Sequence, residues 1–362
     1  MESTSDSDFK DLANGCVLGA FIGDALGSYL EFQEKVTGSQ VDTAMKMPGG
    51  GPFNLSPGQI TDDSELALCL GHGLVAGEGK LDLNKIAEQY RNWINSGPFD
   101  VGITIGSALR VPEGDKEDLA KRIRAASVYS KKSQSNGGLM RITPLCIWAS
   151  KLSRDDLIKA VREETRLTHP NETAINASIA YVYTIQHLLN NKGDYKGAYK
   201  KCQEIVDHLG DSELQSWMEN IDKGEEKLPQ ANHLIGWAKI AFSYSVFYLK
   251  YNMNYSEAMR DLLRRGGDTD TNCAIAGGML GALHGESKLP SEYVKKVLEV
   301  DTKENVRHKR PEFLTPKHFL RKIIENIIKI RPSKLEMVGE ETESERANAP
   351  KTEYKFSDFK KQ

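Results

Sequence analysis

The sequence of 362 residues has few cysteines, no long apolar run and no excess of charge of one sign. Its five cysteines are widely spaced and form no CxxC pair, so they indicate neither a disulfide framework nor a zinc site. No uninterrupted apolar stretch reaches the roughly 18 residues that a membrane-spanning helix needs. A formal net charge of −3 gives no reason to expect a nucleic acid partner. The composition, 39% hydrophobic and 27% charged, is that of an ordinary globular protein.

The first residues, MESTSDSDFKDLAN, lack the charged and then apolar pattern of a secretion signal. We therefore expect an intracellular, cytoplasmic protein without membrane contact, and we expect it to act as a monomer.

Strand patterns are also scarce, because most apolar residues recur at the three- and four-residue spacing of amphipathic helices. The clearest helical segments are residues 83–94, 157–167, 173–189, 234–250 and 318–330. Glycine and proline concentrate in between, at residues 47–59 and 110–118, where we predict loops. The pattern predicts an all-α, compact single domain.

We predict three parts along the chain: a flexible N-terminus over residues 1–13, one folded domain over 14–330 and a tail over 331–362. The tail is charged and poor in apolar residues, so we expect it to be disordered or loosely attached.

Glycines recur every four residues in the segment GCVLGAFIGDALGSYLEF (15–32) and line one face of a helix. Such a face allows another backbone to approach closely, as small residues do in membrane helix pairs. This interpretation explains the glycines but not the acidic residues Asp24 and Glu31 in the same segment.

A second segment, QITDDSELALCLGHGLV (59–75), begins with a hydroxyl and two carboxylates. Thr61 is typical of a helix N-cap, and Asp62 and Asp63 fall in the first turn, where the backbone N–H groups favour anions. The same three residues form a hard-oxygen ligand set for a small divalent cation. The segment read alone leaves both interpretations open.

A third segment, GGDTDTNCAIAGG (266–278), places two aspartates at another helix start, after a pair of glycines. A calcium-binding EF-hand loop beginning at Asp268 needs glycine at its sixth position and glutamate at its twelfth. Cys273 and Met279 stand there, which excludes that loop.

The second and third segments have matching composition, and four carboxylates brought together repel unless cations lie between them. Two Mg²⁺ ions are the usual solution in two-metal hydrolytic sites. Magnesium or manganese fits ligands that are all oxygen, whereas zinc recruits histidine or cysteine.

Six motifs occur in one order along the chain: GDALGSYLE (23–31), TDDSE (61–65), SGPFDVG (96–102), NGGLMR (136–141), LTHP (167–170) and GGDTDT (266–271). In this set the chain resembles the ADP-ribosylglycohydrolase family from about Asn14 to Glu286. The resemblance implies an all-α domain with a binuclear magnesium site. It also implies cleavage of the bond between the anomeric carbon of ADP-ribose and an acceptor.

The resemblance further assigns roles to individual residues. The implied ligands of two Mg²⁺ ions, with Mn²⁺ as a substitute, are Thr61, Asp62, Asp63, Asp268, Asp270 and Thr271. The implied carriers of protons are Glu31 and Asp100. The implied substrate-binding residues are Asn136, Gly137, Gly138, Met140, Arg141 and His169. Glycines in such a loop let backbone N–H groups approach a pyrophosphate. A His-Pro pair before a helix is also a common helix entry, which is the other interpretation of His169.

We therefore expect a hydrolase that releases ADP-ribose from a modified protein or a small conjugate. The SGPFDVG motif is similar to that of bacterial arginine-directed enzymes, which slightly favours an arginine-linked acceptor. A serine-linked acceptor and O-acetyl-ADP-ribose remain open. So do a metal-dependent nucleotide pyrophosphohydrolase and an inactive ADP-ribose-binding relative.

Overall fold

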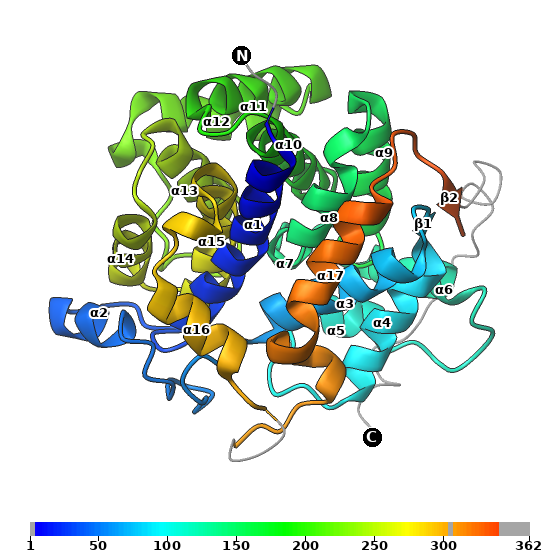
Figure 1. Cartoon of the computed structure of the whole chain (residues 1–362), viewed down its shortest axis with the longest axis horizontal. Helices are drawn as coiled ribbons and strands as arrows, with labels where there is room; N and C mark the ends of the chain where they lie inside the picture. The colour runs from blue at the N-terminus through cyan, green and yellow to red at the C-terminus, as the bar shows by residue number, and fades with distance from the viewer. Residues whose placement is uncertain (1–3, 303–306, 340–362) are drawn as a thin grey trace.

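Two helices lie side by side near the centre of the computed structural model, which describes residues 4–302 and 307–339 (Figure 1). They are α1 (Asp6–Gly27) and α15 (Thr269–His284). A Cβ atom added at Gly19 would collide with the carbonyl oxygen of Gly277, and the Tyr255 hydroxyl donates a hydrogen bond of 2.6 Å to the Gly19 carbonyl. The predicted close approach of a second backbone to the glycine face of α1 is confirmed.

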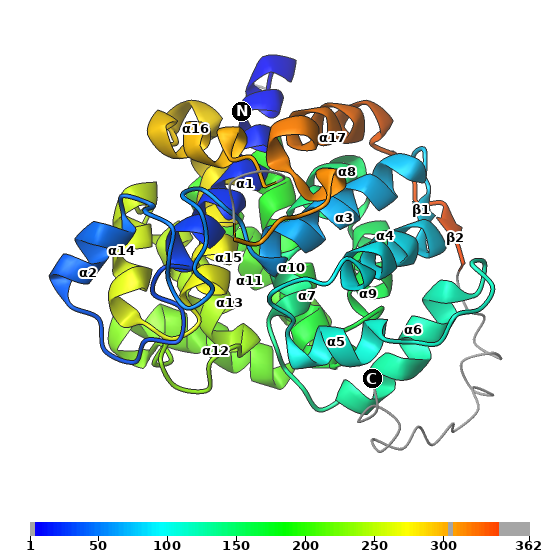
Figure 2. The ribbon, with the colours of Figure 1, turned by 90° about the horizontal axis from the view of Figure 1, so that it is seen from below.

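The other helices surround this pair and confirm the prediction of an all-α fold (Figures 1 and 2). The α-helices of the first half are α2 (Gly38–Ala44), α3 (Asp62–Ala76), α4 (Leu83–Asn95), α5 (Ile103–Leu109), α6 (Leu119–Ser127), α7 (Gly137–Met140), α8 (Thr143–Trp148) and α9 (Arg154–Thr165). Those of the second half are α10 (Glu172–Asn190), α11 (Tyr195–Leu209), α12 (Ser212–Lys223), α13 (Ala238–Lys250), α14 (Tyr255–Arg265), α16 (Ser291–Glu299) and α17 (Pro316–Ile330). Short 3₁₀ turns are Val128–Ser130, Ala149–Lys151, Glu225–Lys227, Glu286–Lys288 and Glu312–Leu314.

Helix α4 illustrates why these segments are helical. Its apolar residues Ile86, Tyr90 and Trp93 recur at three- and four-residue spacing and are fully buried. The Asp82 side chain caps its start by accepting hydrogen bonds from two backbone N–H groups. The observed bounds match the segment predicted from the sequence. None of the helices in the described ranges has the length and apolar character needed to cross a membrane.

The predicted helix at 234–250 begins later than expected, at Ala238. Leu234 and Gly236 have positive φ angles of 52° and 80°, which a right-handed helix cannot contain. Residues 234–237 therefore form a loop.

The N-terminal boundary predicted at residue 14 is corrected to an earlier position. Helix α1 begins at Asp6, and the Ser5 side chain caps it by accepting a hydrogen bond from the Asp8 N–H group. Phe9 and Leu12 are buried against the core, so residues 6–13 belong to the domain. The polar composition concealed the two apolar residues that dock this turn.

The predicted loose tail also needs correction over its first residues. Strand β2 (Met337–Val338) pairs in parallel with β1 (Leu81–Asp82), and the Leu81 N–H group donates a 2.8 Å hydrogen bond to the Glu336 carbonyl. The Arg331 guanidinium lies 3.8 Å from the centre of the Phe9 ring. Residues 331–339 are therefore attached to the domain, and the rest of the predicted tail, 340–362, lies outside the described residues.

Helices α16 and α17 lie along one edge of the molecule, at the top of Figure 2. The chain between them includes the crossing segment, residues 307–315, which passes beside the start of α3. This segment lies beyond every motif that the sequence suggested.

Candidate metal centre and active site

Three parts of the chain bring buried carboxylates together, at the end of α1 and at the starts of α3 and α15. Glu31 follows α1, Asp62 and Asp63 begin α3, and Asp268 and Asp270 begin α15. Each of these five residues is less than a tenth exposed. One carboxylate oxygen from each of Glu31, Asp268 and Asp270 lies within 4.8 Å of the others. Carboxylates crowded in this way are the ordinary ligand set of a hard divalent cation.

Asp24 organises the start of α3 from its position inside α1. Its carboxylate accepts hydrogen bonds from the Thr61 N–H group at 3.0 Å and from the Ser64 N–H group at 3.2 Å. The Thr61 hydroxyl lies 2.9 Å from Asp24 Oδ1 and 3.0 Å from Asp63 Oδ2, and it makes no N-cap hydrogen bond. Thr61 occupies the N-cap position, but its side chain points into the acidic cluster. Helix capping alone therefore does not explain this hydroxyl.

Glu31 performs the matching task for α15. Its Oε2 atom accepts hydrogen bonds from the N–H groups of Thr269 at 2.8 Å and Asp270 at 3.3 Å. The Thr271 N–H group donates to Asp270 Oδ1 at 2.8 Å. The carboxylate expected to carry protons thus lies among the candidate metal ligands, with one oxygen engaged by backbone.

Burial and mutual repulsion disfavour the charged forms of these carboxylates. Burial, reinforced by the Asp268 charge, raises the pKa of Glu31 to about 8. Burial raises the pKa of Asp24 to about 6, against the hydrogen bonds from Thr61 and Ser64. The pKa values of Asp63 and Asp270 lie well above their usual range, because of burial first and neighbouring carboxylates second. A cation is the physical means of keeping such a cluster ionised at neutral pH.

One oxygen in the cluster supports this fit directly. Asp63 Oδ1 is buried and has no hydrogen-bond partner among the described residues. An unpartnered buried carboxylate oxygen is costly, so this atom needs a ligand that protein groups do not supply. The donors around it are hard oxygens, which suit Mg²⁺ or Mn²⁺.

Asp100 lies on the loop between α4 and α5 and is more exposed than the other carboxylates. Burial raises the pKa of Asp100, with a further contribution from the Asp268 charge, while its interaction with Asp62 opposes the rise. These interactions place the Asp100 carboxylate beside the acidic cluster, on the side nearer to solvent.

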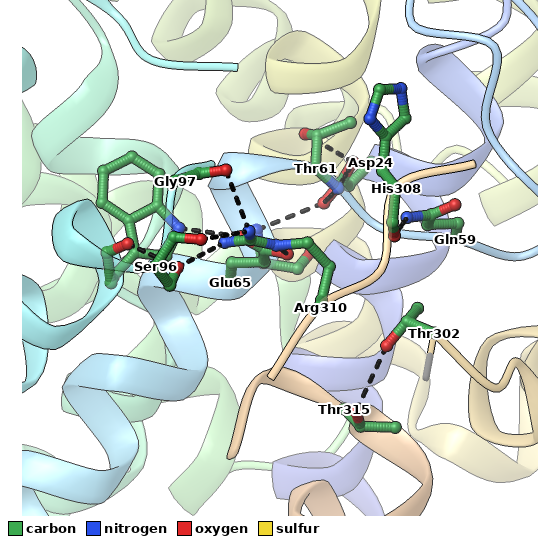
Figure 3. Close-up of polar contacts among 12 residues, drawn as sticks. Asp24, Gln59, Thr61, Glu65, Ser96, Gly97, Thr302, His308, Arg310 and Thr315 are labelled. Atoms are coloured by element: carbon green, nitrogen blue, oxygen red, sulfur yellow. Dashed lines mark hydrogen bonds and ion pairs between the residues drawn. The ribbon is translucent and has the colours of Figure 1, made fainter. Parts of the chain in front are cut away.

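Arg310 of the crossing segment links α3 to the loop between α4 and α5 that carries Asp100. Its Nε and Nη2 atoms donate to the two oxygens of Glu65 at 2.7 and 2.9 Å, and both side chains are only 2% exposed. The same guanidinium donates to the carbonyls of Ser96 and Gly97, both at 3.3 Å, and to the Ser96 hydroxyl at 2.8 Å (Figure 3). Because Glu65 belongs to the helix that carries Asp62 and Asp63, Arg310 fixes two parts of the site relative to each other.

The NGGLMR segment folds as the single-turn helix α7, with Asn136 at its N-cap position. The Asn136 side-chain amide donates a 2.6 Å hydrogen bond to Asp268 Oδ2, which joins this segment to the acidic cluster. The N–H groups of the first helical residues, Gly137 and Gly138, have no acceptor within their helix. Met140 is buried, 5% exposed.

Two of the substrate-binding candidates lie behind α7. Arg141 is fully buried, pairs with Glu164 at 3.0 Å and donates to the Thr168 hydroxyl at 2.8 Å. His169 is 1% exposed, and its Nε2 atom faces the place where a Cβ atom of Gly137 would stand. Burial, together with the charge of Arg141, lowers the pKa of His169 well below its usual range, so the ring is neutral. The Arg141 guanidinium is therefore enclosed, and it supports α7 from within by donating a 3.3 Å hydrogen bond to the Gly137 carbonyl.

A sequence model of the ADP-ribosylglycohydrolase family matches residues 5–322. The chain belongs to this family. Its members include glycosidic-bond hydrolases, and the chain is an enzyme of that class. The resemblance drawn from six short motifs is confirmed over nearly the whole described chain.

Relatives of this ADP-ribosylglycohydrolase come from viruses, bacteria and animals. It is 30% identical over 290 residues to the ADP-ribosyl-[dinitrogen reductase] glycohydrolase of Rhodospirillum rubrum, covering 79% of this chain and 90% of the relative. It is 29% identical to a putative ADP-ribosyl glycohydrolase of Acanthamoeba polyphaga mimivirus, covering 82% and 93%. It is 24% identical to human ADP-ribosylhydrolase ARH3, covering 77% and 87%.

A solved structure titled ADP-ribosylglycohydrolase-related protein complex shares the fold, with a TM-score of 0.68. The identity is 23%, and the match covers 90% of this chain and all of the other. The helical arrangement of this ADP-ribosylglycohydrolase is therefore a known one.

Two residues that hold the ADP-ribosylglycohydrolase site together had no assigned role in the sequence. Asp24 carried a signal, since a carboxylate inside an apolar, glycine-rich helix needs a buried partner. Arg310 carried none, because it lies 245 positions from Glu65 and in a segment without a motif.

Proposed function

We propose that the enzyme is a magnesium-dependent hydrolase that releases ADP-ribose from modified acceptors by cleaving the glycosidic bond at the distal ribose. An arginine-linked acceptor is favoured. The buried acidic cluster carries the proposal, together with the Asp63 oxygen that has no hydrogen-bond partner among the described residues. Relatives named as ADP-ribosylarginine hydrolases, from Pseudomonas putida and Serratia proteamaculans, support the choice of linkage.

The proposed ligands are the hydroxyls and carboxylates at the starts of α3 and α15: Thr61, Asp62, Asp63, Asp268, Asp270 and Thr271. Two bound Mg²⁺ ions would supply charge that holds the vicinal ribose hydroxyls and polarises the anomeric centre. Asp24 and Glu31 keep the two helix starts in place through the backbone hydrogen bonds described above. Carboxylates near the anomeric centre stabilise the positive charge that develops there as the acceptor departs.

Asp100 is the better placed of the two proposed proton carriers. One oxygen of Glu31 is engaged by two backbone N–H groups, whereas Asp100 is more exposed and lies on a loop. A proton carrier must exchange its proton with solvent or substrate, which favours the more exposed group. We assign Asp100 to protonation of the leaving group or activation of water, and Glu31 to positioning.

The start of α7 is proposed to bind the pyrophosphate. Asn136 is held by Asp268, and Gly137 and Gly138 follow it with N–H groups free of intrahelical acceptors. His169, neutral behind the glycines, and the buried Arg141 support this turn.

The experiment is release of free ADP-ribose from matched arginine-linked and serine-linked peptides, each with Mg²⁺ and with excess EDTA. Magnesium-dependent release from the arginine-linked peptide is expected. Full turnover in EDTA contradicts the metal dependence, and release from the serine-linked peptide alone contradicts the linkage. Formation of AMP with ribose phosphate instead would assign the enzyme to pyrophosphate hydrolysis.

A further inference from the structure

Four rings form a continuous row beside the acidic cluster. The Phe32 and Phe53 ring centres are 6.0 Å apart, and those of Phe53 and Phe99 are 5.7 Å apart. The His308 ring lies 4.6 Å from Phe99 and is tilted by 30° relative to it. We call these four residues the ring row.

The ring row extends between the carboxylates of Glu31 and Asp100. Phe32 directly follows Glu31, and Phe99 directly precedes Asp100, so each outer phenylalanine is one residue from a carboxylate of the site. The Phe32 N–H group donates a 2.9 Å hydrogen bond to the carbonyl of Gly267, which precedes Asp268. The backbone of Phe32 is therefore linked to the GGDTDT segment, which carries Asp268 and Asp270.

Core packing does not account for Phe32. Its side chain is 54% exposed, although a large apolar ring is favoured in the interior. Its φ angle is 65°, in the left-handed region that a bulky residue adopts only when its surroundings enforce it. A strained and exposed aromatic residue next to a carboxylate of the acidic cluster indicates a role in binding.

The crossing segment completes the row with His308. The His308 Nε2 atom lies 2.6 Å from the Phe53 carbonyl oxygen, and the Gln59 side chain donates to the His308 carbonyl at 3.1 Å. Figure 3 shows His308 and Gln59 next to Thr61, with Arg310 two residues further along the crossing segment. The His308 ring is thus held by Phe53 and its backbone by Gln59, which lies two residues before Thr61.

We propose that the ring row is the acceptor subsite, and that it recognises the planar guanidinium group of an arginine-linked substrate. Ring faces carry negative quadrupole density and attract planar cations, and guanidinium groups stack on them. Glu31 and Asp100 border the row, and their ionised carboxylates carry charge opposite to that of the guanidinium. A serine-linked acceptor presents a neutral oxygen at this place and gains neither interaction. The inference rests on the proposed function, because it names the acceptor that the same site takes.

The test replaces Phe53 and Phe99 by leucine, which keeps apolar bulk and removes the ring face. For an arginine-linked peptide, KM is expected to rise roughly 3- to 30-fold, the range of a partly desolvated cation–π contact. The kcat value, the melting temperature and the affinity for free ADP-ribose are expected to stay near those of the parent. Phe99→Tyr retains the ring and is expected to retain KM.

The matched control is Phe319→Leu. Phe319 also contacts a histidine, His72, at 5.2 Å between ring centres, but it lies on α17 away from the acidic cluster. This variant is expected to leave KM for every substrate unchanged. A serine-linked peptide serves as the substrate control, and the Phe53 and Phe99 variants are expected to change its kcat/KM by less than about twofold.

Equal losses on both linkages, or loss of thermal stability in step with activity, would overturn the proposal by showing that the rings only hold the crossing segment in place. A parent enzyme that cleaves only the serine-linked peptide would overturn it as well. If the parent cleaves neither peptide, the proposed function fails. The proposal for the ring row is then tested by measuring the affinity of a guanidinium compound, agmatine, for the complex with ADP-ribose. Agmatine should then bind the parent–ADP-ribose complex more tightly than the Phe99→Leu complex, and equal affinity would overturn the inference.

Discussion

The two sides of the site are built in different ways. The proposed metal side consists of the starts of α3 and α15, held by Asp24 and Glu31 and by the glycine contact between α1 and α15. The proposed acceptor side consists of loops that carry Asp100 and the ring row, joined by the crossing segment. Helices fix the acids, whereas the acceptor side depends on one buried ion pair and on ring contacts.

This difference has a physical reason. Charges that must stay a few ångströms apart need rigid supports, because small displacements change their interaction strongly. The acceptor side has to fit different acceptors within one family. Loops suit this task, because they tolerate substitution without disturbing the hydrophobic core. We therefore expect changes on the metal side to remove activity. Changes to the ring row should alter substrate choice, and loss of the Arg310 ion pair should loosen the acceptor side as a whole.

Arg310→Met gives the largest expected effect on stability. It leaves Glu65 buried without its positive partner, which costs about 3–5 kcal/mol. Urea unfolding measures this loss, and Glu65→Gln in the same chain should restore part of it by removing the unpaired charge. The exposed pair Lys10–Glu325 provides the control, since Lys10→Met should cost at most about 1 kcal/mol. Similar losses at the two positions would show that the crossing segment is not anchored by Arg310.

Asp63→Asn gives the largest expected effect on catalysis. It removes the carboxylate whose Oδ1 atom has no partner within the described residues, while keeping the shape of the side chain. We expect kcat to fall by about 10²–10³, the cost of losing one preorganised electrostatic group. The magnesium-dependent rise in melting temperature should also disappear. Asp207→Asn, at an exposed position, serves as the control. A fully active Asp63→Asn enzyme would rule out Asp63 as a metal ligand.

Gly19→Ala tests the helix contact beneath the metal side. A methyl group there would collide with the Gly277 carbonyl, and overpacking of this kind costs about 1–3 kcal/mol. Gly38→Ala is the matched control, because no atom of the described part of the chain lies within 4 Å of its added Cβ. Thermal unfolding measures the melting temperature of both variants, and that of Gly19→Ala is expected to be the lower. Equal melting temperatures would refute the close-packing explanation of the glycine face.

The smallest expected effect is the pH dependence of the metal-free protein. Because the pKa of Glu31 is raised to about 8 in the folded state from an ordinary 4.5, its protonated form favours folding at low pH. That contribution is complete below about pH 4.5 and is lost as the pH rises towards 8. In EDTA we expect the melting temperature to fall by about 2 °C or more between pH 5 and pH 8, corresponding to about 1 kcal/mol. Magnesium should cancel the fall, and Glu31→Gln should reduce it. A flat profile in EDTA would contradict the burial of an uncompensated carboxyl.

The sequence predicted the fold well where the pattern was regular. Helices α4, α9, α10 and α17 follow their apolar periodicity, and the glycine face of α1 met a second backbone as expected. Gly278 shows the limit of that argument: a Cβ atom there would collide with the Tyr181 and Thr143 side chains, whereas it would make only an ordinary contact of 3.6 Å with Ala20 of α1. Spacing alone does not say which glycine of an adjacent pair faces a partner helix.

The sequence by itself determined the helical fold class and the family, and it proposed candidate cation ligands, because periodicity and short motifs are local properties of a chain. Only the tertiary structure decided that Glu31 lies among the candidate ligands, that Arg141 is enclosed and that Arg310 joins α3 to the Asp100 loop. Those facts depend on contacts between positions separated by 23 to 245 residues. Such contacts are set by how the helices pack around α1 and α15, and no local pattern encodes them.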